Sequence, residues 1–248
     1  NLAGTNLAGA NLAGANLAGA NLAGTNLAGT NLAGANLAGA NLTGAVADSS
    51  TVWPTGFNPQ VAGAFQIGPE ADLVGANLTG VDLTEANLAR TDFTKANLAE
   101  LNLARASLIG ANLTGANVAG AYFVGAIADS NTVWPTGFNP QMAGVSQIGP
   151  GADLSRARFI GTYLTQVNLS GANLTETNFT DTDLTGANLT ETNLTRANLT
   201  RADLTRANFT GANLTGTNLT HATLTGTKLF EVNLRQVDLM HVTLNRVQ

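Results

Sequence analysis

The sequence has no cysteine, which excludes disulfide bonds, thiolate metal ligands and a cysteine nucleophile. Its two histidines both lie near the C-terminus and provide no arrangement of a base beside a nucleophile. Aromatic residues make up 5% of the 248 residues and charged residues 11%, less than the core and surface of a compact globule would need. No run of 18 apolar residues and no signal peptide occurs, so no membrane span is predicted within this chain.

What the sequence does have is a large apolar residue at every fifth position. The opening stretch NLAGTNLAGANLAGANLAGA carries leucine at positions 2, 7, 12 and 17. Five residues of an α-helix advance about 500°, so these leucines would spiral around it, and in a straight strand they would alternate faces. If each quintet instead bends the chain by one constant angle, every leucine faces a common axis. The period therefore predicts a solenoid with an internal column of leucine.

This pattern covers three stretches, with apolar centres at positions 2–42, 73–123 and 154–244, or 39 units in all. Leucine fills 33 centres, phenylalanine five and Val118 one. Burying one leucine contributes about 1.5–3 kcal/mol. Ordering the backbone of five residues costs roughly 5–10 kcal/mol. A single unit therefore cannot fold alone, and neighbouring coils must stabilise one another.

The motifs ANLTGANL, ADLTRANF and TNLTRANL resemble the A(N/D)LXX motif of the pentapeptide repeat family, over about four fifths of the chain. The resemblance implies an all-β fold, a right-handed quadrilateral β-helix with four pentapeptides in each coil of twenty residues. Residues 1–248 would then form a single solenoid of about ten coils, roughly 47 Å long at the spacing of adjacent strands.

A coil of twenty residues places residue i over residue i+20. Phe159 should therefore lie over Phe179 in the core. On the outside, one surface column should contain Asp181, Arg201, His221 and His241, and another Glu176, Arg196, Gly216 and Gln236. Opposite charges in such columns attract weakly. Two imidazoles without a third ligand are typical of a solvated column. We therefore expect no metal ligand, no catalytic residue and no cofactor.

Two insertions, residues 46–70 and 127–151, interrupt the repeats. The stretch 46–73 recurs at 127–154 with 22 of 28 residues identical, so the chain contains an internal duplication. Trp-Pro and Gly-Phe predict turns in loops that leave the rod, and Asn58-Pro59 predicts the start of a single helical turn. The phase of the coil across each insertion stays open.

Both tryptophans of the chain lie in these insertions, at equivalent positions. Trp53, Phe57, Trp134 and Phe138 have two interpretations, contact with a partner or packing of the loop on its own rod. Retention of the rings in both copies favours packing. Similar loops with a WP-x-GF-x-P core occur in cyanobacterial members of the family, and this resemblance extends to the repeat domain of proteins linked to heterocyst glycolipid localisation.

The charges favour a non-enzymatic rod that binds a protein partner rather than nucleic acid. Residues 1–45 carry no charge, residues 46–152 carry eight acids and three bases, and residues 153–248 carry eight of each. Two alternatives stay open. The resemblance includes DNA mimics that bind type II topoisomerases, although such a surface should be densely negative. Rows of threonine from Leu164 onward would alternatively present an ice-binding face.

The sequence begins at Asn1, inside a repeat and without methionine. This predicts a domain cut from a larger protein, soluble in itself and attached to a membrane-anchored or exported parent. Uncapped ends would favour end-to-end self-association.

Overall fold

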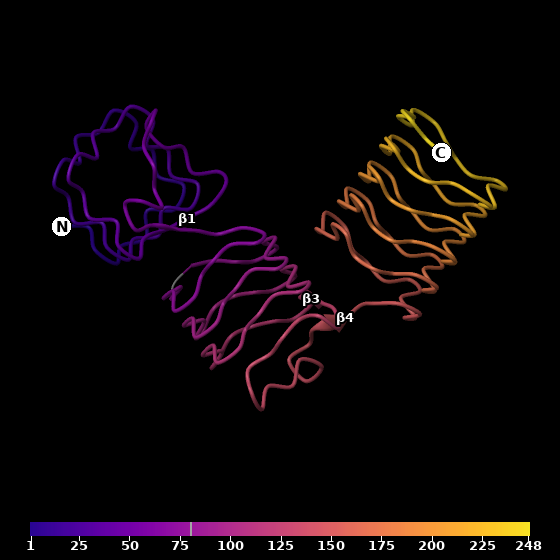
Figure 1. Ribbon diagram of the computed structural model, residues 1–248, viewed down its shortest axis with the longest axis horizontal. Coiled ribbons are helices and arrows are strands. Elements are labelled where there is room, and N and C mark those ends of the chain that lie inside the picture. Colours follow the sequence, from indigo (N-terminus) through magenta and orange to yellow (C-terminus); the bar gives the residue numbers. More distant parts are fainter. Residues whose placement is uncertain (80) are drawn as a thin grey trace. The chain divides into compact units, whose positions relative to one another are not determined.

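The structure is a computed structural model, which describes residues 1–79 and 81–248. Its backbone winds in coils of twenty residues. The coils are visible as stacked loops in Figure 1. Parallel bridges join residues one coil apart, for example Asn6 to Asn26 and Asn178 to Asn198. Four pentapeptides therefore complete one coil, and each centre lies over another centre in the next coil. Each five-residue unit thus forms one of the four faces of a coil.

Each pentapeptide turns at the residues that follow its centre. At Leu22 the carbonyl accepts the Thr25 N–H at 3.1 Å, and Gly24 between them has φ +65°. A positive φ at the third residue of such a turn favours glycine. The Asn21 carboxamide oxygen accepts the Ala23 N–H at 3.1 Å and fixes the approach to the turn. These bonds explain why asparagine and glycine recur every five residues.

Hydrogen bonds between coils and burial of the centres hold the stack together. The Leu7 N–H donates to the Asn26 carbonyl at 2.8 Å, and the Asn26 N–H donates to Thr5 at 3.0 Å. Most leucine centres from Leu22 to Leu224 are fully buried. Threonine two residues before a centre is buried too, and its hydroxyl donates to a carbonyl of the preceding coil, as Thr30 does to Leu7 at 2.8 Å. The small position of the repeat thus tolerates a polar group because its hydrogen bond is made.

Within the described chain, strands of two residues occur in the insertions, whereas the repeats pair through single-residue bridges. The strands are β1 (Val46–Ala47), β2 (Phe65–Gln66), β3 (Ile127–Ala128) and β4 (Ser146–Gln147), and β1 pairs with β2 and β3 with β4, both in parallel. Asn31 pairs with Val52, an offset of 21, whereas Val46 pairs with Phe65, an offset of 19. Bridges thus join Val46, Ala47, Val52, Phe65 and Gln66 to neighbouring coils, and the loop excursion of the insertion 46–70 stays a prediction. The two offsets thus depart from twenty by one residue in opposite directions.

Between these pairs the first insertion follows its own turns, and no bridge of the described chain involves residues 53–62. The expected helical turn takes the form of a short turn without a helix. The Asn58 carboxamide oxygen accepts the Val61 N–H at 3.2 Å, and the Pro59 carbonyl accepts the Ala64 N–H at 2.9 Å. The second copy repeats both bonds, from Met142 to Asn139 at 3.1 Å and from Val145 to Pro140 at 3.0 Å.

The chain divides into two compact units. One contains Asn1–Ala126 with Asn131–Val145, and the other contains Ile127–Ser130 with Ser146–Gln248. Whether residues 1–248 form one continuous solenoid stays a prediction. Among the described residues, no helix has the length and apolar character needed to cross a membrane.

Candidate interaction surface

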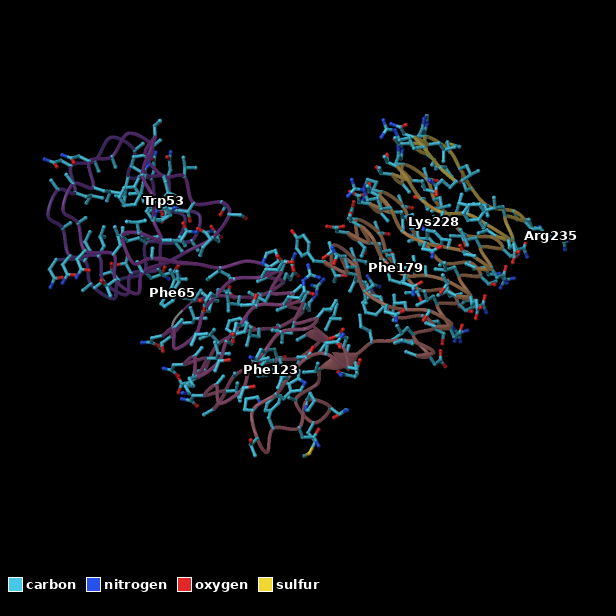
Figure 2. All side chains as sticks on the ribbon, in the orientation of Figure 1. Trp53, Phe65, Phe123, Phe179, Lys228 and Arg235 are labelled. Atoms are coloured by element: carbon cyan, nitrogen blue, oxygen red, sulfur yellow. The ribbon has the colours of Figure 1, made fainter. Side chains whose placement is uncertain are left out.

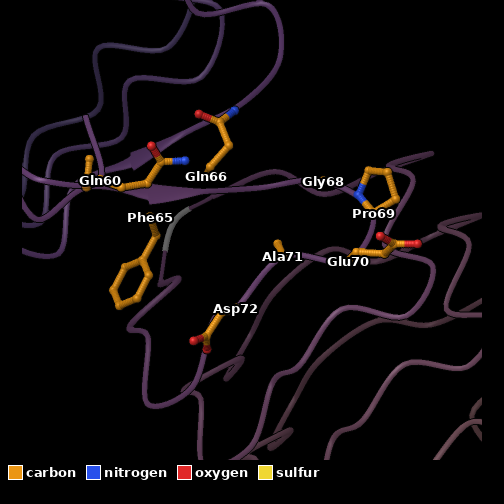
Figure 3. A pocket seen from close by; sticks show the side chains of 9 residues that line it. Gln60, Phe65, Gln66, Gly68, Pro69, Glu70, Ala71 and Asp72 are labelled. Atoms are coloured by element: carbon orange, nitrogen blue, oxygen red, sulfur yellow. The ribbon is translucent and has the colours of Figure 1, made fainter. Parts of the chain in front are cut away.

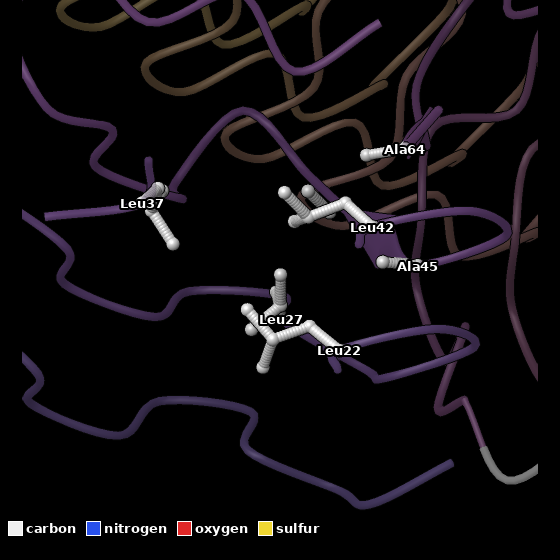
Figure 4. Packing of buried hydrophobic residues seen from close by; sticks show 7 residues of the cluster. Leu22, Leu27, Leu37, Leu42, Ala45 and Ala64 are labelled. Carbon is white, nitrogen blue, oxygen red and sulfur yellow. The ribbon is translucent and has the colours of Figure 1, made fainter. Parts of the chain in front are cut away.

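The aromatic rings of the first insertion pack on the core rather than projecting into solvent. Trp53 and Phe57 stack with their ring centroids 5.3 Å apart, and both are half-buried. They pack against a cluster of buried leucine and alanine, shown in Figure 4, that includes Leu22, Leu27 and Leu42. Figure 2 places Trp53 within these coils. Most of their apolar area is thus withdrawn from a partner.

The second insertion buries its rings against a third aromatic residue. Trp134 stacks on Phe138 at 5.0 Å, and the fully buried Phe123 lies 5.7 Å from Trp134 and 5.2 Å from Phe138. The Trp134 Nε1 atom is buried and has no hydrogen-bond partner within the described chain. The Trp134 ring therefore packs within its own chain and offers little exposed surface for a partner to bind. Phe159 and Phe179, in the other unit, stack in the core at 5.4 Å.

Exposed charges gather instead at the corner of each pentapeptide, two residues after the centre. Among residues 1–79 and 81–248, nineteen residues other than glycine have a positive φ, and all of them are charged residues, glutamine or histidine. Glycine avoids backbone strain there, so a side chain at this position costs conformational energy in each case. Successive coils align these corners into vertical columns. We define these aligned positions as the corner columns.

Ion pairs link neighbouring coils along the corner columns. Arg90 pairs with Glu70 at 2.6 Å, Arg105 with Glu85 at 2.7 Å, and Arg201 with Asp181 at 2.6 Å. In another column Glu176 accepts from Arg156 at 2.9 Å and lies 3.9 Å from Arg196. Arg156 was missed in the expected column, although counting back twenty residues from Glu176 would have found it. The exposed positions of these pairs limit their contribution to stability.

The Asp181–Arg201 pair changes the acidity of both groups. Hydrogen bonds from the Arg201 guanidinium hold the pKa of Asp181 below its ordinary value, and the same bonds raise the pKa of Arg201. Below this pair the same column continues with His221 and His241, whose rings stack at 4.8 Å with planes 10° apart. The four residues of the expected column therefore form two contacting pairs.

A hollow of about 320 Å³ lies where the first insertion ends, lined by residues that include Gln60, Phe65 and Asp72 (Figure 3). Its other carboxylate belongs to Glu70, which pairs with Arg90. Within the described part of the chain, no three histidine, cysteine, aspartate or glutamate residues lie close enough together to hold a metal ion.

A family model described as pentapeptide repeats matches the chain in eight copies, within residues 1–46, 70–127 and 152–246. The chain belongs to the pentapeptide repeat family. Members of this family fold as right-handed quadrilateral β-helices. The bridges between residues i and i+20 agree with that fold, and they explain why the match skips most of both insertions.

Several solved pentapeptide repeat proteins are similar to this chain, and comparison with curated protein sequences gives no match. HetL from Nostoc sp. strain PCC 7120, involved in heterocyst differentiation regulation, is 28% identical; the match covers 98% of this chain and 89% of HetL, with a TM-score of 0.25. Another pentapeptide repeat protein from Nostoc PCC 7120 is 25% identical. The match covers 57% of this chain and 79% of that protein, with a TM-score of 0.24. The plasmid-mediated fluoroquinolone resistance protein QnrB1 is 17% identical over 93% and 91%, with a TM-score of 0.26.

Proposed function

We propose that this pentapeptide repeat protein is a non-enzymatic structural scaffold that binds a protein partner through its corner columns. The observation that carries the proposal is the separation of roles in the repeat: apolar groups face the axis, and charges gather at the corners. Solenoids in general present extended surfaces of this kind to partners. The half-buried insertion rings argue for packing, so Trp53, Phe57, Trp134 and Phe138 are assigned to the scaffold and not to the binding surface.

Capture by the full chain, followed by substitution of the corner charges, tests this proposal. The variant Arg156→Gln/Arg196→Gln/Arg206→Gln removes three exposed corner charges, and Arg158→Gln/Lys228→Gln/Arg235→Gln is its matched control away from the corners. A specific partner should be lost from the triple variant and kept by the control, and its capture should weaken as salt rises. Equal capture by both variants would contradict the assignment to the corner columns.

DNA mimicry is the second candidate function, directed at a type II topoisomerase. It is favoured by the excess of acids in residues 46–152. The inter-coil ion pairs count against it, because Glu70 and Glu85 are each neutralised by an arginine. A DNA supercoiling assay separates the two functions, since only a mimic would inhibit the topoisomerase.

An ice-binding face is the third candidate, and the threonine rows are its basis. Many of these hydroxyls, including Thr180, Thr195 and Thr200, already donate to an asparagine oxygen two residues earlier at 2.6 Å. Their hydrogens are therefore committed within the chain. Absence of thermal hysteresis would exclude this function.

The biological setting extends the proposal. We infer that this scaffold belongs to a larger cyanobacterial protein, with heterocyst glycolipid localisation as the process it serves. The complete reading frame tests this: a parent without a membrane anchor or an export signal would contradict it.

A further inference from the structure

Although the sequence alone favours a solvated column here, we propose that His221 and His241 form a binding site for one late first-row divalent transition-metal ion, of the group Cu²⁺, Ni²⁺ and Zn²⁺. The two imidazoles lie one coil apart, with ring centroids 4.8 Å apart and planes within 10° of parallel. Both side chains are exposed. Neither ring is engaged in a hydrogen bond or ion pair within residues 1–79 and 81–248, so their nitrogens are free to bind.

The corner column brings the two rings to this distance. Both histidines occupy the position with positive φ, at +61° and +57°, from which side chains project away from the core. The His221 N–H donates to the Met240 carbonyl at 3.0 Å, which ties the two corners together through the backbone. The same column brings the Arg201 guanidinium within 2.6 Å of Asp181, so its side chains are long enough to meet across one coil.

Chelation requires both rings to leave their parallel stack, because the lone pair of an imidazole nitrogen lies in the plane of its ring and parallel planes do not meet at one ion. Two nitrogens that share one ion at about 2.0–2.1 Å each lie about 3 Å apart. Since both side chains are exposed, we expect rotation about their torsions to turn one nitrogen of each ring toward a shared ion. Imidazole is a preferred ligand of Zn²⁺, Cu²⁺ and Ni²⁺, and divalent affinity rises towards Cu²⁺.

The surroundings of the pair are compatible with a divalent cation. Arg201, the next residue up the column, is held by two hydrogen bonds to Asp181, which compensates its charge. Because no third histidine, cysteine or carboxylate is clustered there among the described residues, water would complete the coordination shell. The result is an open site with two protein ligands. It would clamp the coil that contains His241 to the coil before it.

Titration of the full, untagged chain with Cu²⁺, Ni²⁺ and Zn²⁺ by calorimetry tests this site. We expect one ion per chain. His221→Asn and His241→Asn should each lower the affinity by about 100-fold or more, because chelation by two linked ligands exceeds binding by either one alone. If each single variant keeps one ion with an affinity within about threefold of the parent chain, the histidines bind independently and the proposal is wrong.

A relocated pair distinguishes chelation from a damaged coil. The double substitution Arg201→His/His241→Asn restores two histidines one coil apart in the same column, next to Asp181 rather than at the original level. We expect this variant to regain binding of one ion, while His241→Asn alone does not. Failure of the double variant to bind, with an unfolding midpoint equal to that of His241→Asn, would overturn the geometric argument. The result is independent of the capture experiment on the corner arginines.

Discussion

The two insertions have almost the same sequence but different interiors. In the first copy Trp53 and Phe57 stack on each other and pack against an aliphatic cluster that includes Leu42. In the second copy the residue 81 positions after Leu42 is Phe123, and its ring contacts both Trp134 and Phe138. The difference lies in the repeat that precedes the insertion. The same insertion motif therefore keeps its turns whether its two rings pack against aliphatic side chains or against a phenylalanine.

The backbone of the two copies is alike where their side chains differ. Val52 pairs with Asn31 and Val133 with Asn112, in each case at an offset of 21. Thr51 donates to the Leu27 carbonyl at 2.9 Å, and Thr132 donates to Leu108 at 2.8 Å. These buried threonines secure the same change of register in both copies. Side-chain packing then adapts to that backbone.

Asp48 has a special position in the first copy. Its carboxylate accepts the Gly29 N–H at 2.9 Å, whereas the corresponding glycine of an ordinary repeat, such as Gly24, donates to a backbone carbonyl. Ser50 and Thr51 donate to the same oxygen. The carboxylate therefore replaces a carbonyl at the point where the offset changes from 20 to 21. The aspartate is a structural partner and not a free acid.

The largest expected loss of folding free energy comes from removing Phe123, which packs against both rings of the second copy. Phe123→Ala should destabilise the fold by about 3–5 kcal/mol, because it leaves a cavity under two rings. Its matched control, Leu42→Ala, removes a smaller side chain and should cost less, about 2–4 kcal/mol. Guanidinium unfolding followed by tryptophan fluorescence measures both, with Trp53→Phe or Trp134→Phe leaving one reporter near each site. Equal losses would show that the two interiors are energetically the same.

A smaller effect is expected at Asp48. Asp48→Ala should destabilise the first copy by about 1–2 kcal/mol, since the Gly29 N–H loses its partner and solvent screens part of the interaction. Asp48→Asn, which keeps the acceptor oxygen, should cost less. Fluorescence of Trp53 during unfolding reports the change. An Asp48→Ala variant as stable as the parent would contradict the role in register.

The same residue predicts a dependence on pH. Partial burial alone would raise the pKa of Asp48, but hydrogen bonds from Ser50, the Gly29 N–H and Thr51 hold it below the ordinary value. Because the folded-state pKa is lowered, the stabilisation is complete above the unfolded-state value of about 3.9 and is lost as pH falls through the folded-state value. Acid titration of stability, compared with Asp48→Asn, measures this contribution. The difference between the two proteins should shrink below about pH 4.

Exchange of Phe65 and Ser146 tests how far the paired strands depend on side chains. Phe65 in β2 is half-buried and Ser146 in β4 is exposed, although both follow the same register. Phe65→Ser should cost about 1 kcal/mol through lost apolar burial. Ser146→Phe should be nearly neutral. Amide hydrogen exchange at Gln66 and Gln147 measures the strand pairing. Faster exchange in either variant would show that the pairing depends on the side chain at position 65 or 146.

The smallest effect is expected in the corner columns, outside both insertions. Arg201→Ala removes the partner that holds the pKa of Asp181 down. The pair is exposed, so the unfolding midpoint should shift little, and less at high salt. The pKa of Asp181, followed by NMR, should rise towards its ordinary value. A large loss of stability would show that corner pairs contribute more than screening allows.

Much of this architecture could be predicted from the repeats. A period of five with leucine centres excludes helix and straight strand, and the coil of twenty residues, taken from the family resemblance, brings Phe159 over Phe179 and His221 over His241. The insertions could not be resolved in the same way. Turn residues at Pro54 and Gly56 predict a departure from the coil, but the pairing of Val52 with Asn31 depends on the register of a distant segment. Local sequence does not encode that offset.

By itself, the sequence determined the period, the apolar column and the positions of glycine and charge, because each follows from the short-range geometry of one pentapeptide. Only the tertiary structure decided that Asp48 completes a coil, that Phe123 supports Trp134, and that the histidine rings lie 4.8 Å apart. These contacts join residues separated by 11 to 20 positions, so their distances depend on how the chain turns between them.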